Sequence, residues 1–456
     1  MNKFCVHLRS SIIFQMILFL YLQNETFATT QTKIKQIGPK VQQNIKQKNN
    51  NDKTYANLLT KQQIIDDINY VLKSIKGTHV STINGFSEDI INQTNIEISN
   101  LKDKVSINDE WRIISRILHH LKDAHTMIDA PDGLDKTFPF NVKYDKSLNN
   151  FVVTDGKFTN YEIASINDTT INTLYETFKK HFSYEIEERV SSCFFKKNPL
   201  NETKLILCGI NVAAPLKIVL KSGKITKVQK IKLVPLQKQT CVNPWVSYSF
   251  DMDNRIGIFT LDNCIFNEEY KSSVDTFFDE VRKNNINNII LDLRNNNGGD
   301  SRVANYFLSY FKINDPLYRN RVDIREGNTI KHYEEHSISM NNIDINTYDV
   351  MNSKAFYNGN IYVLTSNSTF SSAVMFANII SDNKIGKIIG EVPGNAPTAF
   401  GDIKYFDIPN SKLKFCTTYK KFYRLDMTKN QERLIPDVQV DSENAMQKAY
   451  EVIKNS

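Results

Sequence analysis

Cysteine is scarce in this sequence, and no two cysteines have C-x-x-C spacing. Six cysteines occur in 456 residues, and five remain if Cys5 leaves with an N-terminal signal segment. An odd and sparse set excludes a disulfide framework, and the missing C-x-x-C pair argues against a thiolate metal site. Cys193 and Cys208 are close enough in sequence to close one hairpin in an oxidising compartment, but buried free thiols explain them equally well.

Strong charge of one sign is also missing. The sequence has 57 lysines and arginines against 50 aspartates and glutamates, a formal net charge of +7. No clustered basic face with a known nucleic-acid-binding module is present, so we expect no nucleic-acid partner. Hydrophobic residues make up 41% and charged residues 23% of the chain, which are ordinary values for a globular protein.

Only one apolar run approaches a membrane span in length, and it lies at the N-terminus. Lys3 and Arg9 precede the run at residues 12–22, which is shorter than the about 20 apolar residues that cross a bilayer. Residues 26–28 (TFA) offer a small-x-small cleavage site. We therefore expect a signal peptide over residues 1–28, with an uncleaved anchor as the alternative. The mature protein is then secreted or extracytoplasmic, without stable membrane insertion.

The composition changes several times after this segment. Residues 29–54 are rich in lysine, glutamine and asparagine, which predicts a disordered linker. Residues 55–133 contain two amphipathic helices, one that begins with a capping box at Thr60 and one that begins near Ser106. Residues 134–245 form a mixed, mostly β module with one helix. Its predicted strands are Phe151–Val153, Tyr161–Ile166, Leu205–Leu207 and Ile218–Leu220.

From residue 246 the pattern is β/α. The first unit has a strand at 256–261, a helix at 268–282, a buried strand at 289–293 and the turn NNNGGD at 295–300. The second has a strand at 361–365, the turn TFSSA at 369–373, a helix to about residue 382 and a strand at 385–390. Ligands bind at the C-terminal ends of strands in open α/β sheets, so both turns are expected at one site.

Ser371 is the candidate nucleophile, because it lies between a buried strand and a helix. Backbone N–H groups at a helix start favour negative charge, so they can hold the oxyanion formed when a serine attacks a carbonyl. Gly298 and Gly299 follow the neighbouring strand and could supply a second oxyanion donor. The G-x-S-x-G string of α/β hydrolases is absent, and a simple helix cap at Thr369 or Ser371 is the better interpretation of the local sequence alone.

A serine nucleophile needs a base, and His125 follows a predicted helix end beside Asp123. Composition alone does not choose it among the histidines. A competing motif is HYEEH, in which His332 and His336 match the H-x-x-E-H pattern of inverted zincins. On a helix these two histidines would share a face and could hold zinc. The flanks of the motif are loop-like, which argues against such a helix.

Together these segments resemble the C-terminal-processing (tail-specific) serine peptidase family. The resemblance rests on the order and spacing of IILDLRNNNGGDSRVANYFLSYF (289–311), IYVLTSNSTFSSAVMFANIISDNKIGKIIGE (361–391), GDIKYFDIPNSKLKF (401–415), LIPDVQV (434–440) and two N-terminal segments (59–81 and 118–128). It implies an α/β fold with a crotonase-like (ClpP/crotonase) catalytic core. The implied divisions are a helical cap (55–133), an inserted PDZ-like β module (134–245), the catalytic domain (246–445) and a C-terminal tail (446–456).

The resemblance also implies roles for particular residues. It places the nucleophile on Ser371, with Ser372 as the neighbouring alternative. The implied oxyanion donors are the backbone N–H groups of Ser372 and of Gly298 or Gly299. Many members pair the serine with a lysine further along the chain, but Ala396 stands at that spacing. A Ser/Lys mechanism is therefore disfavoured.

The sequence is instead similar to the branch that includes the tricorn protease core and the retinoid-binding repeats. Tricorn-like enzymes take a histidine from the N-terminal region, and His125 in DAHT matches that position. Ala124 replaces the serine that precedes this histidine in tricorn. The implied acid is Glu432, before the final Pro-Asp, with Asp426 as the second choice.

We therefore expect a secreted serine-type endopeptidase that hydrolyses polypeptide substrates through an acyl-enzyme. No metal or organic cofactor is implied. An inactive protein of the same fold that binds a peptide or a hydrophobic ligand is the first alternative, because a fold does not determine a function. A zinc hydrolase at HYEEH is the second.

Overall fold

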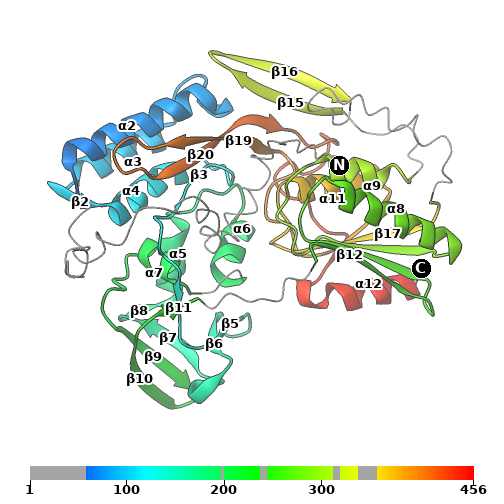
Figure 1. The fold of residues 1–456 in the computed structure, drawn as a ribbon, viewed down its shortest axis with the longest axis horizontal. Coiled ribbons are helices and arrows are strands. Elements are labelled where there is room, and N and C mark those ends of the chain that lie inside the picture. The colour runs from blue at the N-terminus through cyan, green and yellow to red at the C-terminus, as the bar shows by residue number, and fades with distance from the viewer. Residues whose placement is uncertain (1–57, 197–199, 237–243, 312–318, 337–356, 456) are drawn as a thin grey trace, which may run out of the picture.

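The computed structural model describes residues 58–196, 200–236, 244–311, 319–336 and 357–455 (Figure 1). The predicted signal peptide and the linker at 29–54 lie outside the described residues. Among the helices that are described, none combines the length and the apolar character needed to cross a membrane.

Three helices form the N-terminal region: α2 (Lys61–Thr78), α3 (Glu88–Ser99) and α4 (Ile107–His119). The capping box is confirmed, since the Thr60 hydroxyl accepts from the Gln63 N–H and the Gln63 side chain accepts from the Thr60 N–H. The Ser106 hydroxyl likewise accepts from the Asp109 N–H and starts α4. Short strands β1 (Leu58–Thr60) and β2 (Lys104–Ser106) pair beside them.

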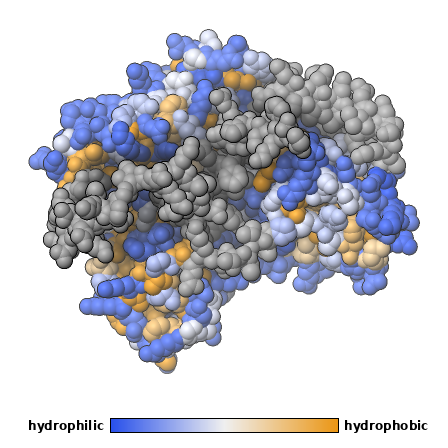
Figure 2. Space-filling model, viewed as in Figure 1, coloured by the Kyte–Doolittle hydropathy of each residue, from blue (hydrophilic) through white to orange (hydrophobic). Residues whose placement is uncertain are grey.

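The middle module contains a six-stranded sheet in the order β10-β9-β7-β6-β5, with β8 paired to β7. Its elements are β5 (Val142–Asp145), β6 (Asn150–Val153), β7 (Glu162–Ile166), β8 (Thr169–Thr170), α5 (Ile171–Lys179), β9 (Leu216–Ser222) and β10 (Ile225–Ile231). Figure 2 shows hydrophobic residues on the surface of this module among hydrophilic ones. Exposed apolar side chains of the module include Leu148, Ile225 and Val228, and no predicted site residue lies among them.

The predicted strand at Leu205–Leu207 is wrong. These residues form the last turn of helix α7 (Glu202–Leu207). At the start of this helix the Asn201 side chain accepts from the Lys204 N–H at 3.0 Å. All three apolar side chains are buried, and a short apolar run does not distinguish a buried strand from a buried helical turn. The cysteines Cys193 and Cys208 are both free thiols, so the hairpin disulfide is not formed in this structure.

The region from residue 246 onward is built on a second six-stranded sheet in the order β12-β13-β14-β17-β18-β21. The strands are β12 (Val246–Asp251), β13 (Ile256–Leu261), β14 (Asn288–Asp292), β17 (Asn360–Thr365), β18 (Gly386–Gly390) and β21 (Val438–Gln439). β12 is antiparallel to β13 and the other pairs are parallel. The predicted β/α pattern is confirmed, and β14 and β17 are neighbours, so the turns that follow them lie together.

Helices cover both faces of this sheet (Figure 1). On one face α8 (Glu268–Lys283), α9 (Arg302–Leu308) and α11 (Ser372–Asp382) pack against residues such as Leu291 and Val363. On the other face α12 (Ala445–Lys454) packs against Ile290 and Leu364. Neighbouring residues of one strand thus point to opposite layers, as the period of two requires. The segment predicted as a tail is largely this helix.

A third sheet, in the order β16-β15-β20-β19, links the N-terminal region to the region after residue 246. It comprises β15 (Arg319–Glu326), β16 (Thr329–His336), β19 (Ala399–Asp407) and β20 (Lys414–Phe422), with β3 (Met127–Ile128) paired to β20. The β3–β20 pairing brings the chain just after His125 against this later region.

The zinc-hydrolase alternative is wrong, because HYEEH lies on strand β16 and not on a helix. Residues four apart on a strand are separated by about 13 Å along its axis, which is too far for His332 and His336 to bind one zinc ion. The His332 Nδ1 atom instead lies 2.6 Å from the Asp323 Oδ1 atom.

Glu110 on α4 gives the fold a pH-dependent stability. Its side chain is fully buried, and burial, followed by the neighbouring Asp67, raises its pKa from 4.5 to about 9. Because the folded pKa exceeds the unfolded one, the folded state binds the extra proton. Stability contributed by this group is therefore complete below about pH 4.5 and declines as the pH rises towards 9.

We expect Glu110→Gln, an uncharged isostere, to raise the free energy of unfolding at pH 8 by on the order of 3 kcal/mol. At pH 4.5 the same change should have little effect. Urea unfolding at both pH values measures the difference. Glu88→Gln, at an exposed position on α3, is the control and should change stability by less than about 0.5 kcal/mol at either pH. Equal effects of Glu110→Gln at both pH values would contradict the assignment.

Candidate active site

Ser371 has a strained backbone at the start of α11. Its φ is 54° and its ψ is −126°, a combination that residues with a Cβ rarely adopt. The side chain makes no capping hydrogen bond, so the helix-cap interpretation of Ser371 is wrong. Strain at one residue persists only where its surroundings enforce it, and such residues cluster at functional sites.

Hydrogen bonds of the loop around Ser371 hold its backbone in this strained conformation. The Thr369 hydroxyl donates to the Leu293 carbonyl at 2.8 Å, and the Phe370 N–H donates to the Asn296 carbonyl at 2.9 Å. The Ser371 N–H donates to the Asn395 Oδ1 atom at 2.6 Å. These contacts tie the loop to the end of β14 and to the segment after β18. Asn395 is buried, and no sequence motif indicated this contact.

The glycine turn after β14 lies directly against Ser371. A Cβ atom on Gly298 would lie 2.6 Å from the Ser371 Cβ and 2.8 Å from the Phe370 carbonyl oxygen. A Cβ atom on Gly299 would lie 2.3 Å from the Cys264 carbonyl oxygen. Both glycines have positive φ, 93° and 132°. Only glycine permits this approach of two backbones, and the expectation that the two turns lie together is confirmed.

Two backbone N–H groups at this contact are available to a ligand. The Gly298 N–H is already used, because it donates to the Asn296 Oδ1 atom at 2.8 Å. The Gly299 and Ser372 N–H groups donate to no acceptor within the described part of the chain. The Gly299 carbonyl accepts from the Ser372 hydroxyl at 2.6 Å, so the two residues that carry these N–H groups are in contact.

His125 lies beside the same loop. Its ring stacks on Phe370, the residue before Ser371, with centroids 4.6 Å apart and planes inclined by 29°. The side chain is only 4% exposed, and neither ring nitrogen has a hydrogen-bond partner among the residues that the structure describes. Burial lowers the pKa of His125, although the nearby Asp123 charge opposes the shift. A neutral imidazole can accept a proton.

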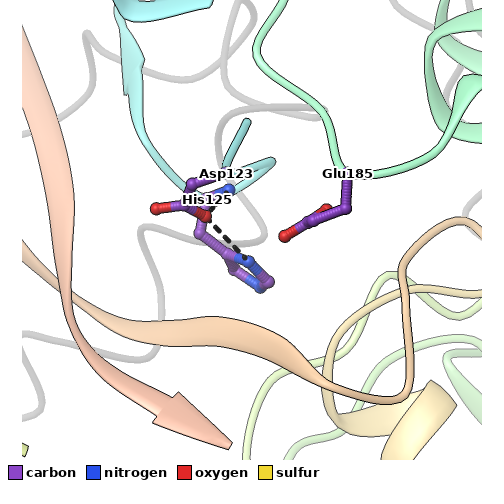
Figure 3. A group of neighbouring side chains, drawn as sticks. All are labelled: Asp123, His125 and Glu185. Carbon is purple, nitrogen blue, oxygen red and sulfur yellow. Dashed lines mark hydrogen bonds and ion pairs between the residues drawn. The ribbon is translucent and has the colours of Figure 1, made fainter. Parts of the chain in front are cut away.

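Asp123 fixes the segment that carries His125 (Figure 3). Its Oδ1 atom accepts from the His125 N–H at 2.9 Å, and its Oδ2 atom accepts from the Thr126 and Thr418 hydroxyls at 2.6 and 2.8 Å. The His79 Nε2 atom lies 3.2 Å away. Burial disfavours ionisation of Asp123, but the hydrogen bond and charge of His79 hold its pKa at about 2.

Glu185 is a further acid beside His125, and the sequence analysis missed it. It lies in the loop before α6 (Glu187–Ser191), and its carboxylate points towards the imidazole ring (Figure 3). Both carboxylate oxygens are buried and have no hydrogen-bond partner in the described part of the chain. Burial, followed by the charge of Asp123, raises the pKa of Glu185 to about 8. No local motif marks this position, because the packing of distant segments creates it.

Neither acid expected from the sequence contacts His125 in the described structure. Glu432 is exposed, and its backbone N–H donates to the Asn430 side chain. Asp426 accepts from the Thr428 N–H and hydroxyl. The structure thus brings together Ser371, Ser372, Gly298, Gly299 and His125, and leaves Glu432 and Asp426 apart from the imidazole.

Residues 255–440 match the sequence model of peptidase family S41. The family resemblance read from the sequence is confirmed over this part of the chain. The match supports a serine-type peptidase. No curated protein has a sequence similar enough to match this chain.

Solved structures with the same fold are distant in sequence. Mature CPAF complexed with lactacystin superposes with a TM-score of 0.58 at 12% identity, covering 87% of this chain and 97% of that one. A CPAF mutant superposes with a TM-score of 0.60 at 10% identity, covering 86% and 96%. At this identity the likeness concerns the fold alone, a mixed α/β architecture shared along most of both chains.

Asn395→Ala should lower kcat/KM for peptide cleavage by about 10- to 100-fold, with most of the loss in kcat. The change removes the acceptor of the Ser371 N–H, so Ser371 is released from its strained conformation. Asn367→Ala is the matched control, because Asn367 lies in the same loop but donates to the Val392 carbonyl. Steady-state kinetics of both variants tests the assignment, and equal losses would contradict it.

Proposed function

We propose that the chain is an endopeptidase in which Ser371 is the nucleophile and His125 is the general base. One observation carries this proposal. Ser371 is held in a strained conformation at a helix start, directly against a glycine turn. Two free N–H groups lie at that contact, which is the arrangement that serine acyl transfer requires.

The chemistry follows from these positions. The Ser371 hydroxyl attacks the substrate carbonyl, and His125 takes the hydroxyl proton. The Ser372 and Gly299 N–H groups stabilise the tetrahedral oxyanion. We favour Gly299 over Gly298 as donor, because the Gly298 N–H is already bonded to Asn296. The protonated His125 then donates to the leaving amine, and water hydrolyses the acyl-enzyme by the same steps in reverse.

The third member of the catalytic group is a separate proposal. Family resemblance supports Glu432 through the order of motifs alone. Geometry supports Asp123, whose Oδ1 atom lies 3.8 Å from the His125 Nδ1 atom and which anchors the His125 backbone. We propose that Asp123 positions His125 in the arrangement described here. Measuring kcat of Asp123→Asn and of Glu432→Gln separates the two proposals. Substitution of the acid that positions His125 should lower kcat by more than tenfold.

The finer architecture also belongs to the proposal. The parallel sheet with its two helical layers supports a crotonase-like core within 246–445, and the sheet with α5 supports a PDZ-like module within 134–245. The helices within 55–133 form the proposed cap. The N-terminal sequence supports export and cleavage after residue 28, which N-terminal sequencing of the protein recovered outside the cytoplasm would test.

The pH profile of peptide cleavage tests the proposed base. Because burial lowers the pKa of His125 below 6.5, the imidazole stays neutral to lower pH than an exposed histidine. The acidic limb of kcat/KM should therefore fall below pH 6.5. Cleavage of an internally quenched peptide library between pH 4 and 9 measures it. A limb above pH 6.5, or one unchanged in His125→Ala, would contradict the assignment.

A further inference from the structure

Three metal-ligating side chains converge beside the nucleophile loop. One ligand atom from each of Asp123, His125 and Glu185 lies within 4.8 Å of the other two (Figure 3). Within the described residues, both His125 ring nitrogens and both Glu185 carboxylate oxygens are buried without a hydrogen-bond partner, and the His125 side chain is only 4% exposed. Buried polar atoms are normally satisfied, so this cluster of ligand atoms is suited to binding an ion.

We propose that Asp123, His125 and Glu185 form a divalent transition-metal site, best suited to Zn²⁺, and that the bound ion reversibly inhibits the peptidase. The proposed inhibition rests on the proposed role of His125 as the general base. The proposed metal site is independent of that role. A histidine that donates its lone pair to a metal cannot take the proton of Ser371. The site would therefore couple peptidase activity to the concentration of free metal.

The geometry fits zinc with a small adjustment. Zinc–nitrogen and zinc–oxygen bonds of about 2.0 to 2.1 Å in a tetrahedral site separate the ligand atoms by about 3.3 Å. The His125 Nδ1 and Asp123 Oδ1 atoms are 3.8 Å apart, so closure by about half an ångström brings them into range. A Glu185 side-chain rotation supplies the third ligand, and water can fill the fourth position.

Charge and surroundings favour the same ion. The carboxylates of Asp123 and Glu185 balance the +2 charge, which buried cations require, once Glu185 releases its proton to solvent as the ion binds. The charge of Arg189, which also acts on His125 and Glu185, opposes the ion in part. The Thr126 and Thr418 hydroxyls hold the Asp123 carboxylate in place, as outer hydrogen bonds do around metal ligands. One imidazole with two carboxylates selects zinc over Mg²⁺ or Ca²⁺, which prefer sites made of oxygen alone.

The test uses Ser371→Ala protein, so that zinc binding is measured without peptidase activity. Zn²⁺ is titrated in competition with a chromophoric chelator, and Co²⁺ is added separately to record d–d absorption bands. We expect one tight site per chain. Glu185→Gln and His125→Gln in the same background should weaken it at least about tenfold. His332→Gln, which alters a half-exposed histidine on β16, is the control and should leave affinity unchanged.

Activity provides the second measurement. In the enzyme with Ser371 intact, Zn²⁺ should inhibit peptide cleavage and EDTA should restore it, with the inhibition constant raised at least tenfold by Glu185→Gln. Zinc binding without any peptidase activity would sustain the site and overturn the proposed function. If the enzyme is active and all variants bind zinc with the same affinity, the proposed metal site is wrong. If the variants do not fold, absence of Co²⁺ bands in Ser371→Ala protein overturns it as well.

Discussion

Ser371→Ala is expected to lower kcat/KM for peptide cleavage by at least about 10⁴-fold. The substitution removes the only atom that forms the acyl-enzyme bond in the proposed mechanism. Its effect on stability should be small, within about 0.5 kcal/mol. The Ser371 hydroxyl makes no capping hydrogen bond, and alanine bears the same strain at φ 54°. Single-turnover kinetics and urea unfolding measure the two effects separately.

Ser372→Ala is the matched control, since the turn contains two adjacent serines. The Ser372 hydroxyl donates to the Gly299 carbonyl at 2.6 Å, so its loss loosens the glycine turn without removing the nucleophile. We expect a decrease in kcat/KM of no more than about 30-fold, in line with loss of one supporting hydrogen bond. The reverse order of effects would move the nucleophile to Ser372.

Gly298→Ala should lower kcat/KM by at least about 100-fold. The new Cβ would lie 2.6 Å from the Ser371 Cβ and 3.0 Å from the Ser372 nitrogen, so the nucleophile and an oxyanion donor must both move. Alanine is also strained at φ 93°. We expect a loss of unfolding free energy of about 2 kcal/mol from these two effects.

Gly85→Ala separates the backbone effect from the steric one. Gly85 has a φ of 108°, and nothing lies within 4 Å of a Cβ built there. It should therefore lose about 1 kcal/mol of stability from strain and keep its peptidase activity. Comparable activity of Gly298→Ala and Gly85→Ala would show that the glycine turn does not form the site.

The sequence predicted the catalytic sheet well, because hydrophobic periodicity carries that information. Buried strands such as Ile256–Leu261 and the capping box at Thr60 were found with correct bounds. Local sequence predicted less well where tertiary packing decides. The apolar run at Leu205–Leu207, predicted as a strand, is helical. HYEEH, for which the sequence argued only against a helix, lies on a strand.

The candidate site was predictable only in part. Ser371 and His125 were found because the family resemblance supplied spacings that cover the whole chain. Asn395 and Glu185 carry no motif, and each acquires its role from a contact with a segment far away in sequence. The strain at Ser371 depends on those contacts, so no local pattern reveals it.

The most direct test of the central claim is labelling of the EDTA-treated protein with a fluorophosphonate probe, followed by peptide mapping. The account predicts covalent label on Ser371 in the native enzyme and none in Ser371→Ala. His125→Ala should lose most of the label, because its serine is no longer activated. Absence of label from a folded, metal-free protein, or label on another residue, would contradict the assignment of Ser371 as the nucleophile.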